Sequence, residues 1–489
     1  MSQSVRSQSI SFASYKFTVM KVEQIYTGCI AHAAYYLESD GEAAIFDPLR
    51  EVQPYIERAK ADHSKIKYVF ETHFHADFVS GHLDLAQKTG ATIVYGPTAK
   101  PGFDALVAED LQEFKIGAYT VRVLHTPGHT MESTTYLLID ENGKEHGIIT
   151  GDTLFIGDVG RPDLAQHVIA DLTEQKLAAH LYDSLRNKIM PLSDDLIVYP
   201  NHGAGSACGK KMSKETTDTL GNQKRINYAL RPDMTKEEFI DELLTGLTTP
   251  PAYFPKNVLM NIQGYDSLDT IMDRANRGLT PSSFELMANE TGALILDTRA
   301  PEIFAQGFIP NSINIGLDGN FAMWVGEMIN DIKQEILLVT EVGREEEAII
   351  RLSRVGYDHT VGYLKGGFEA WRAEGRELDK VQRITAATFA AQFNEKAPTF
   401  DVRKRSEFQA EHVVDVINIP LNEINLHLAK FPADENFILH CAGGYRSMIA
   451  ASILKSRGIH NFVDVIGGMS EITKTNVPKT AYVCPSTLL

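Results

Sequence analysis

The segment Thr72-His73-Phe74-His75-Ala76-Asp77-Phe78 places two imidazoles and a carboxylate at alternate positions. Imidazole and carboxylate groups are common ligands of zinc and of non-haem iron. The pattern H-x-H-x-D-H supplies ligands to two adjacent metals, but here its sixth position is Phe78, whose ring cannot bind a metal. The segment therefore predicts a site for one ion, which favours redox chemistry at iron over hydrolysis.

Further acids and imidazoles follow predicted strands. The strands expected at 67–72, 117–124, 147–150 and 196–199 lead to His73, His129, Asp152 and His202 respectively. Strand ends hold side chains in fixed positions while the following loops supply the chemistry. We therefore expect the ligand inventory to converge on one site; it comprises His73, His75, Asp77, His129, Asp152 and His202.

A second reactive centre is expected at His440-Cys441-Ala-Gly-Gly-Tyr-Arg-Ser447. This segment follows a predicted strand and precedes the helical run 448–454. Backbone N–H groups and the helix dipole at such a junction stabilise a thiolate or a bound persulfide anion. Arg446 adds positive charge, so we predict Cys441 and Arg446 as catalytic residues.

The C-terminal half contains an internal repeat. A strand ending in D-x-R occurs at 294–299 and again at 399–403, and each copy closes with a Gly-Gly pair, at 366–367 and at 467–468. Strands alternating with helices at this spacing predict parallel α/β units of about 100 residues. The first copy has no cysteine at 338–347, and the three consecutive glutamates at 345–347 would repel an anionic sulfur donor, so we predict a spacer or interface role.

Composition limits the function classes. The 489 residues allow about three domains, and the proline-rich segment 248–255 is expected to be a tether. The net charge of −17 argues against nucleic acid as the main partner. No run of about 18 or more apolar residues occurs, so no membrane partner is expected.

The four cysteines, at positions 29, 208, 441 and 484, are too sparse for a disulfide scaffold and predict a cytoplasmic protein with one or two reactive thiols. The first 20 residues lack Asp and Glu. We interpret them as a disordered leader, with an organellar targeting segment as the alternative.

Residues 17–262 resemble the metallo-β-lactamase superfamily through the His73 segment, Thr126-Pro-Gly-His-Thr130 and Thr150-Gly-Asp-Thr153. The Cys441 loop resembles rhodanese sulfurtransferases. Together these segments resemble persulfide dioxygenase–rhodanese fusions. The resemblance implies an α/β chain with an N-terminal αββα sandwich at 17–262, a rhodanese-like domain without the catalytic cysteine at 276–380 and a rhodanese domain at 384–489, both with parallel sheets.

The resemblance also implies an activity. In persulfide dioxygenases one mononuclear Fe(II) is held by two histidines and one aspartate, which here correspond to His73, His129 and Asp152. His75, Asp77 and His202 would then orient the ligands or serve as scaffolding only. The substrates would be a low-molecular-weight persulfide, such as glutathione persulfide, and O2, and the products would be sulfite and thiol. Cys441 would carry sulfane sulfur toward thiosulfate, and a homo-oligomer is expected.

Three further residues are candidates for substrate binding. Arg161 suits a substrate carboxylate, or else braces its loop through Asp163. Cys208 lies in a Gly-rich loop and either relays a persulfide or is a buried core thiol. Lys210 would add positive potential for an anionic thiol, or is simply solvated.

Two other functions stay open. One is a thioester hydrolase like glyoxalase II fused to a sulfurtransferase. Phe78 argues against this function, because it replaces a histidine of the two-metal pattern. The other is a sulfur-responsive binding protein with inert domains.

Overall fold

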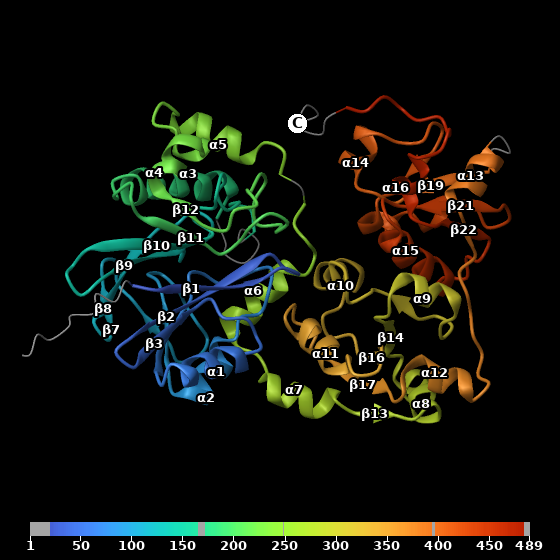
Figure 1. Ribbon diagram of the computed structural model, residues 1–489, viewed down its shortest axis with the longest axis horizontal. Coiled ribbons are helices and arrows are strands. Elements are labelled where there is room, and N and C mark those ends of the chain that lie inside the picture. The colour runs from blue at the N-terminus through green and yellow to red at the C-terminus, as the bar shows by residue number, and fades with distance from the viewer. Residues whose placement is uncertain (1–19, 165–171, 248, 394–396, 484–489) are drawn as a thin grey trace, which may run out of the picture.

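The structure is a computed structural model that describes residues 20–164, 172–247, 249–393 and 397–483. The predicted leader lies almost entirely outside these residues. Three units follow one another along the chain, and they occupy the left, lower right and upper right of Figure 1. Within the described residues, no helix is long and apolar enough to cross a membrane.

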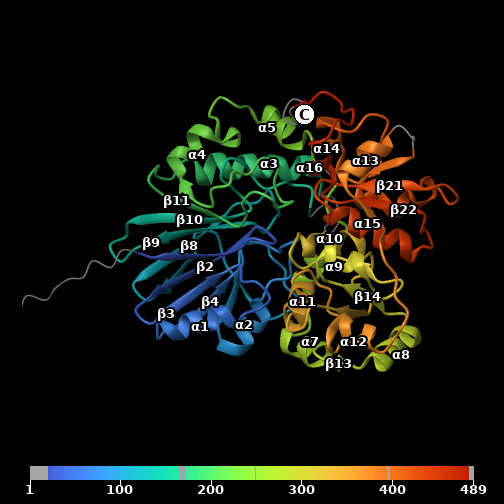
Figure 2. The same ribbon diagram turned by 45° about the vertical axis from the view of Figure 1, so that its right-hand side comes forward.

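The first unit is a sandwich of two six-stranded sheets, in the orders β1-β2-β3-β4-β5-β6 and β12-β11-β10-β9-β8-β7. Helices α1 and α2 cover the first sheet, and α3, α4 and α5 cover the second, giving four layers (Figures 1 and 2). The strands are β1 (Val22–Thr27), β2 (His32–Ser39), β3 (Glu42–Phe46), β4 (Lys65–Phe70), β5 (Thr92–Tyr95), β6 (Leu106–Val107), β7 (Glu113–Ile116), β8 (Tyr119–His125), β9 (Thr134–Ile139), β10 (Glu145–Gly151), β11 (Ile197–Pro200) and β12 (Asp218–Thr219). The helices are α1 (Gln53–Ala61), α2 (His82–Thr89), α3 (Glu174–Ser184), α4 (Leu220–Ile226) and α5 (Lys236–Leu244).

The second and third units share one topology. Their sheets run in the orders β13-β17-β16-β14-β15 and β18-β22-β21-β19-β20, and every strand pair in both is parallel. The second unit contains β13 (Gly278–Leu279), α8 (Pro281–Thr291), β14 (Leu294–Asp297), α9 (Pro301–Gln306), β15 (Ile313–Asn314), α10 (Phe321–Met328), β16 (Ile336–Val339), α11 (Glu345–Ser353), β17 (Thr360–Leu364) and α12 (Gly367–Ala373). The third contains β18 (Arg383–Ile384), α13 (Ala386–Gln392), β19 (Thr399–Asp401), α14 (Arg405–Ala410), β20 (Ile417–Asn418), β21 (Phe437–His440), α15 (Tyr445–Ser456), β22 (Phe462–Val465) and α16 (Gly468–Ile472).

Local sequence explains where many helices begin. Serine or threonine side chains at the N-cap accept a backbone N–H bond at α3, α4, α5, α8 and α13, and also at α7 (Leu268–Ala275), which links the first two units. Such caps satisfy N–H groups that the first turn leaves unpaired. Thr235 and Glu238 form a full capping box at α5.

Parallel pairing brings the chemically active loops together. β3 and β4 pair in parallel with Phe46 opposite Phe70, and β10 and β11 pair in parallel with Gly151 opposite Pro200. Strands that run in parallel end at the same edge, so the loops that follow them lie side by side. The two sheets thus deliver their acids and imidazoles to one end of the sandwich.

The segment predicted as a tether, 248–255, also contributes buried side chains at its C-terminal end. Helices α6 (Phe254–Gln263) and α7 (Leu268–Ala275) link the first two units, and Tyr253 and Phe254 are buried. Nearby, the fully buried Arg50 of the first unit donates to both carboxylate oxygens of Asp358, at 3.1 and 2.9 Å. A buried charge pair of this kind is costly to break, so it fixes how the first and second units meet.

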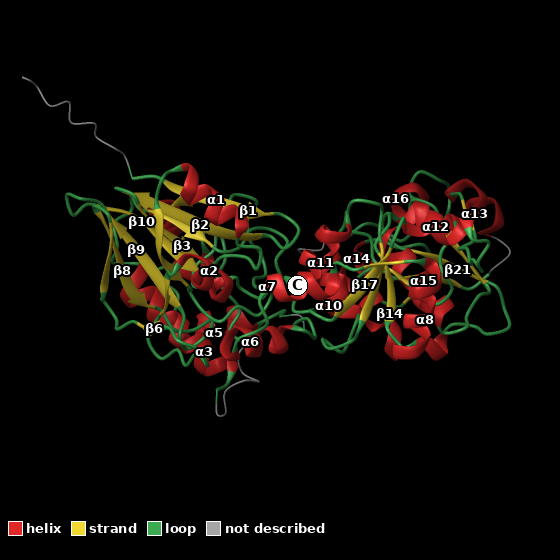
Figure 3. Cartoon of the chain, turned by 90° about the horizontal axis from the view of Figure 1, so that it is seen from below, coloured by secondary structure: helices red, strands yellow, loops and turns green. Residues whose placement is uncertain are grey.

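Helix α10 lies where the three units meet (Figures 1 and 3). A Cβ on Gly326 would lie 2.1 Å from the Tyr253 ring, and a Cβ on Gly319 would lie 2.3 Å from the Tyr445 ring. Tyr253 precedes α6, and Tyr445 begins α15 of the third unit. The two glycines therefore let aromatic side chains from both neighbouring units pack directly on the α10 segment.

We predict that Gly326→Ala destabilises the protein by about 1–3 kcal/mol, the usual cost of overpacking. The alanine would gain roughly 0.5–1 kcal/mol of helix propensity, but the Tyr253 ring has to move to admit the methyl group. Chemical denaturation followed by fluorescence measures the change. Gly28→Ala is the matched control, because a Cβ there meets nothing within 4 Å; equal effects of both changes would contradict the prediction.

Candidate metal centre and sulfur-transfer loop

The three predicted iron ligands lie together. One ligand atom from each of His73, His129 and Asp152 falls within 4.8 Å of the others, and all three side chains are buried. Asp152 Oδ2 lies 3.9 Å from His73 Nε2 and 3.5 Å from His129 Nε2. Ligand atoms about 2.0–2.2 Å from one ion are roughly 3–4 Å apart. The spacing thus fits a metal ion, and neither oxygen of Asp152 has a hydrogen-bond partner among the described residues.

Hydrogen bonds orient three imidazoles in the same way. His129 Nδ1 lies 2.8 Å from the Arg161 carbonyl, and His202 Nδ1 lies 3.1 Å from the Ala31 carbonyl. Because a carbonyl only accepts, each Nδ1 donates and leaves Nε2 with a free lone pair. His73 Nδ1 meets Thr72 Oγ1 at 3.0 Å, and that hydroxyl is placed to donate to Asp47. Such outer contacts fix a metal-binding tautomer.

A second group of donors adjoins the first. Asp77, His202 and Cys208 are buried, with one ligand atom of each within 4.8 Å of the others. His202 Nε2 lies 3.5 Å from Asp77 Oδ2 and also 3.5 Å from Asp152 Oδ1. The two oxygens of Asp152 therefore face different donor groups: Oδ2 faces the first group and Oδ1 faces the second. Phe78 removes a histidine from the two-metal pattern, but the structure brings Cys208 into the second group.

Burial governs the protonation of the second group. It raises the pKa of Cys208 well above the usual thiol value, and the charges of Asp77 and Asp152 raise it further. Burial also raises the pKa of Asp77. Without a nearby cation the Cys208 thiol keeps its proton. Its burial agrees with the alternative of a buried thiol and not with an exposed thiol that relays a persulfide.

His75 belongs to a third buried group, with Asp47 and Glu71. Its Nε2 lies 3.0 Å from Asp47 Oδ1 and 3.5 Å from Glu71 Oε2. Burial by itself lowers the pKa of His75, but the hydrogen bonds and charges of these two carboxylates outweigh it and raise that pKa. The arrangement agrees with the role beside the metal that was expected for His75, which stays a prediction.

Phe78 fills the space beside this group. Its fully buried ring packs between the imidazoles of His32 and His75, with centroid distances of 4.2 and 4.3 Å. The Nδ1 atom of His82 lies 3.6 Å from Glu71 Oε1, and its ring packs at a tilt on Phe103 with 4.9 Å between the centroids. Within the described residues His82 joins no donor group of the metal centre.

The sequence did not lead us to expect Asp47, Glu71 or His32 among the residues of this site. Asp47 follows β3 and Glu71 follows β4, the same strand-end position that singled out Asp152. That signal was available for both carboxylates. His32 had no such signal: it begins β2, and its Nε2 contacts the Asp47 carbonyl at 2.9 Å.

Two substrate-binding candidates are engaged elsewhere. Arg161 forms two 2.6 Å hydrogen bonds to Asp163, so the guanidinium braces its own loop. Lys210 Nζ donates to the Thr245 carbonyl at 3.0 Å and to the Glu242 carbonyl, at the end of α5. The contacts of Arg161 favour its alternative role as a brace of its own loop. Lys210 is bound to the end of α5, so it is not simply solvated as its alternative had it.

The backbone of the ligand loop is held from outside the sandwich. Asn261 of α6 donates to the carbonyls of His75 and Phe78, both at 2.8 Å, and accepts from the Ser80 N–H at 2.9 Å. The Val79 N–H donates to the Arg354 carbonyl of the second unit at 2.7 Å. A buried loop needs such partners because its polar backbone groups have no water.

A cavity of about 170 Å³ opens beside Asp77. We call it the mouth cavity. Its lining includes Cys29 and Tyr253 and, from the second unit, Asn320 and Met323. Cys29 Sγ lies 3.3 Å from Arg354 Nη1. The cavity beside Asp77 is therefore built partly by the second unit.

Cys441 lies in the loop between β21 and α15, as the sequence predicts. Its Sγ accepts the Gly444 N–H at 3.1 Å. The N–H groups of Met469 and Ser470 donate to the carbonyls of Cys441 and Ala442, at 2.7 and 2.9 Å. A Cβ on Gly468 would lie 2.3 Å from the Cys441 carbonyl oxygen, which explains a glycine at this closing turn.

Arg446 is already paired. Its guanidinium donates to both oxygens of Glu407, at 2.5 and 2.8 Å. Burial works to raise the pKa of Glu407, but Arg446 outweighs it and the net shift is downward. The pair lies in the lining of a cavity of about 580 Å³ that contains Cys441, here called the Cys441 cavity.

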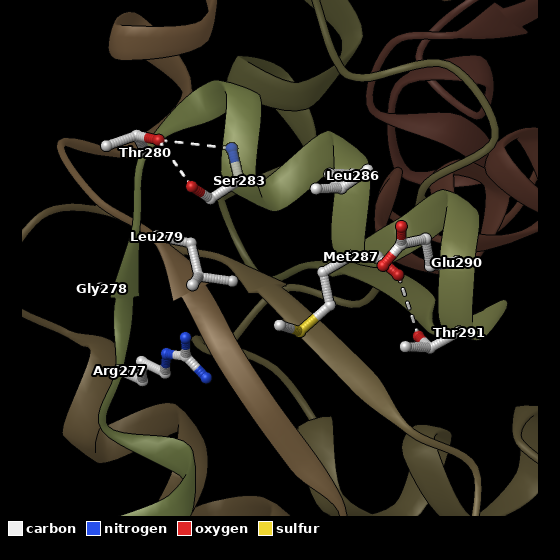
Figure 4. Close-up of a pocket in the computed structure, with 9 residues that line it drawn as sticks. All are labelled: Arg277, Gly278, Leu279, Thr280, Ser283, Leu286, Met287, Glu290 and Thr291. Atoms are coloured by element: carbon white, nitrogen blue, oxygen red, sulfur yellow. Dashed lines mark hydrogen bonds between the residues drawn. The ribbon is translucent and has the colours of Figure 1, made fainter.

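The second unit keeps the scaffold and lacks the thiol. Thr340 follows β16 as Cys441 follows β21. Arg299 and Asp297 form a buried ion pair, as Arg403 and Asp401 do in the third unit. Another cavity of this unit, of about 410 Å³ between β13 and α8, is drawn in Figure 4; its charged lining residues are Arg277 and Glu290.

Family models match most of the sandwich and both parallel-sheet units. The metallo-beta-lactamase superfamily matches residues 27–202, and the rhodanese-like domain matches residues 280–374 and 385–475. A metallo-beta-lactamase from Staphylococcus aureus subsp. aureus COL is 30% identical with a TM-score of 0.62, over 71% of this chain and 99% of that chain. The chain belongs to the metallo-beta-lactamase superfamily. Two tandem rhodanese-like domains follow the metallo-beta-lactamase domain, and the predicted fold class is confirmed.

Other similarities are shorter. A hydroxyacylglutathione hydrolase from Tolumonas auensis is 33% identical over 171 residues, 34% of this chain and 59% of the relative. A probable hydroxyacylglutathione hydrolase from Schizosaccharomyces pombe is 29% identical over 36% of this chain and 66% of the relative. ETHE1 from Myxococcus xanthus is 26% identical with a TM-score of 0.42, over 50% of this chain and 99% of that chain. The chain thus spans less than two thirds of these hydrolases, whose activity does not transfer by similarity alone.

We predict that Asn261→Ala costs roughly 2–4 kcal/mol, because it leaves buried backbone groups of the ligand loop unpaired. The same change should loosen the loop and lower metal retention during dialysis. Thermal unfolding and metal analysis measure the two effects. Asn276→Ala, at an exposed position, is the control; retention equal to wild type in Asn261→Ala would show that the loop holds its shape without α6.

Proposed function

We propose that the metallo-beta-lactamase domain is a persulfide dioxygenase. It would oxidise a low-molecular-weight persulfide, such as glutathione persulfide, with O2 to sulfite and thiol. The observation that supports this most is the buried group of two imidazoles and one carboxylate, His73, His129 and Asp152. Such a triad leaves coordination positions open for substrates on a single Fe(II).

The chain's own residues would hold and shape this site. Arg161 and Ala31 accept through their carbonyls and thereby fix the ligand tautomers of His129 and His202. His75, held by Asp47, would keep positive charge beside the triad. Iron bound by the triad would supply the redox chemistry that lets O2 react with a persulfide.

We further propose that the third domain is a sulfurtransferase. The Cys441 thiolate would attack the outer sulfur of a persulfide RSSH, forming Cys441–S–SH and releasing RS⁻. The Gly444 N–H at Sγ and the start of α15 stabilise negative charge there. A reducing cytoplasm would keep this thiol free.

A second candidate is a thioester hydrolase fused to the same sulfurtransferase. The donor group of Asp77, His202 and Cys208 favours it, because Asp152 could bridge two ions between the two groups. The hydroxyacylglutathione hydrolases named above are similar to about a third of this chain. Metal content separates the two candidates.

We predict one iron per chain in protein purified without oxygen, and O2 uptake when glutathione persulfide is added. Asp152→Ala should lower that uptake on the order of 100-fold or more, because it removes a metal ligand. Loss of a group that only hydrogen-bonds to a ligand already lowers metal affinity or activity by roughly 10–100-fold. Asp273→Ala, an exposed acid, is the control. Two zinc ions per chain with thioester hydrolysis and no O2 uptake would instead establish the hydrolase.

We predict that Cys441→Ser abolishes sulfur transfer from thiosulfate and leaves O2 uptake intact, because the two sites use separate side chains. Mass spectrometry should find one added sulfur atom on Cys441 of the wild type after exposure to persulfide. Thr340→Ser, at the matching position of the second domain, is the control and should transfer normally. Transfer that persists in Cys441→Ser would place the reactive thiol elsewhere.

A further inference from the structure

A buried charge pair lies beneath the Cys441 loop of the third domain. Arg383 of β18 donates through Nε to Asp464 Oδ2 of β22 at 3.0 Å. The Asp464 carboxyl is fully buried, and the side chain of Arg383 is only 12% exposed. Neither residue belongs to the lining of the Cys441 cavity. Burying two charges away from the substrate cavity is costly, so the pair calls for a function.

Contacts connect this pair to the turn that holds the sulfur. A Cβ on Gly444 would lie 3.6 Å from Arg383 Nη2, so the guanidinium lies against the glycine whose N–H binds Cys441 Sγ at 3.1 Å. Ser447, in the first turn of α15, donates to the Gly444 carbonyl at 3.3 Å. The same hydroxyl lies close enough to Asp464 to lower the pKa of that carboxyl. Gly444 is therefore linked to Arg383 directly and to Asp464 through Ser447.

The pair keeps charge beside the turn. Nη2 of Arg383 and Oδ1 of Asp464 are buried without a hydrogen-bond partner among the described residues. Burial, helped by the charge of Glu302 from the second domain, raises the pKa of Asp464 to about 6, although Ser447 and Arg383 work to lower it. The carboxyl is therefore mostly ionised at neutral pH. It holds one edge of the guanidinium, while the nitrogen that lies against Gly444 is not taken up by any acceptor in the described part of the chain.

The second domain has the same fold without this pair. Strands β13 and β17 pair in the register of β18 and β22, and Gly278 lies opposite Tyr363 where the third domain has Arg383 opposite Asp464. Both domains keep the other buried ion pair, that of the D-x-R motif. Of the two domains, the one with a cysteine after its central strand is thus the one that has a charge pair at this position.

The turn itself does not require the pair. Gly444 has a φ of +104° and lies three residues after Cys441, and Gly343 has a φ of +91° and lies three residues after Thr340. A Cβ on Gly343 would meet nothing within 4 Å, so no group lies there in the place that Arg383 takes beside Gly444. The same turn forms with and without the pair, which ties the pair to the sulfur and not to folding.

We propose that Arg383, held in place by Asp464, is a positioning residue for Cys441 that keeps the Gly444 N–H directed at the sulfur and thereby stabilises negative charge on it. A backbone N–H at the start of a helix stabilises a thiolate only while it stays at hydrogen-bond distance. The proposal rests on the sulfurtransferase function proposed above, because it assigns the pair to that reaction. The reactivity of the sulfur can nevertheless be measured without turnover.

Alkylation tests the role of Arg383 at the sulfur itself. The full-length protein is treated with iodoacetamide over a range of pH, and mass spectrometry follows the peptide that contains Cys441. In Arg383→Gln the pH of half-maximal alkylation rate should rise, and the rate at neutral pH should fall about tenfold, as expected for a weakened hydrogen bond to a charged group. The kcat for sulfur transfer from thiosulfate to cyanide should fall by a similar factor with little change in KM, because no residue in the lining of the cavity is altered.

Three further variants make the result specific. Arg383→Lys keeps the positive charge and should recover part of the alkylation rate. Asp464→Asn should act as Arg383→Gln does, and the double variant should be no worse than either single one, because the two residues act as a unit. Arg405→Gln is the matched control: it removes the arginine of an exposed ion pair with Glu423 in the same domain and should behave as wild type.

The outcomes separate a positioning role from a structural one. Alkylation of Arg383→Gln at the wild-type rate would overturn the proposal, and so would a lower melting temperature with an unchanged pH dependence of alkylation. Fully additive effects of the two single changes would overturn the joint action of the pair. Asp464→Asn, which keeps the side-chain shape, decides the question if Arg383→Gln does not fold. Wild-type protein that transfers no sulfur would overturn the proposed function, while alkylation still decides whether Arg383 acts on Cys441.

Discussion

The metal centre depends on one requirement: the buried loop that carries His75 and Asp77 must find partners for its polar backbone. Asn261 of α6 supplies three hydrogen bonds, and the Arg354 carbonyl of the second domain supplies another. Unpaired backbone groups in a dry interior cost free energy comparable to the bonds they lack. The ligand loop therefore takes its shape only when the linker helix and the second domain are packed against the sandwich.

This dependence explains the form of the domain contacts. Arg50, fully buried, reaches Asp358, and Tyr253 and Tyr445 pack on the glycines of the α10 segment. One apolar cluster extends through all three domains and includes Phe74, Trp324 and Ile449, among others. The second domain has no thiol but keeps its buried Asp297–Arg299 pair, because that pair maintains the fold that the other two domains pack against.

Much of the metal centre could be predicted because a strand fixes the position of the first residues after its end. Asp152 and His202 come after neighbouring parallel strands, so their convergence is a consequence of strand order. Asp47 and Glu71 carried the same signal, but their role beside His75 emerges only in the folded sandwich. Cys208 could not be placed, because it lies in a Gly-rich loop whose path is set by contacts, including the Arg161 N–H on its carbonyl at 3.0 Å.

The sequence by itself indicated the duplicated parallel-sheet units and the loop that contains Cys441, because periodicity, glycine pairs and strand–loop–helix order are local properties. The αββα sandwich was implied by the resemblance that the metal-binding motifs carry. Tertiary structure alone decided that Cys208 joins Asp77 and His202, that Arg161 and Lys210 are bound elsewhere, and that the start of α10 lines both cavities. These features join residues far apart in the chain. They depend on which groups compete for each partner in the packed interior, and no local pattern encodes that competition.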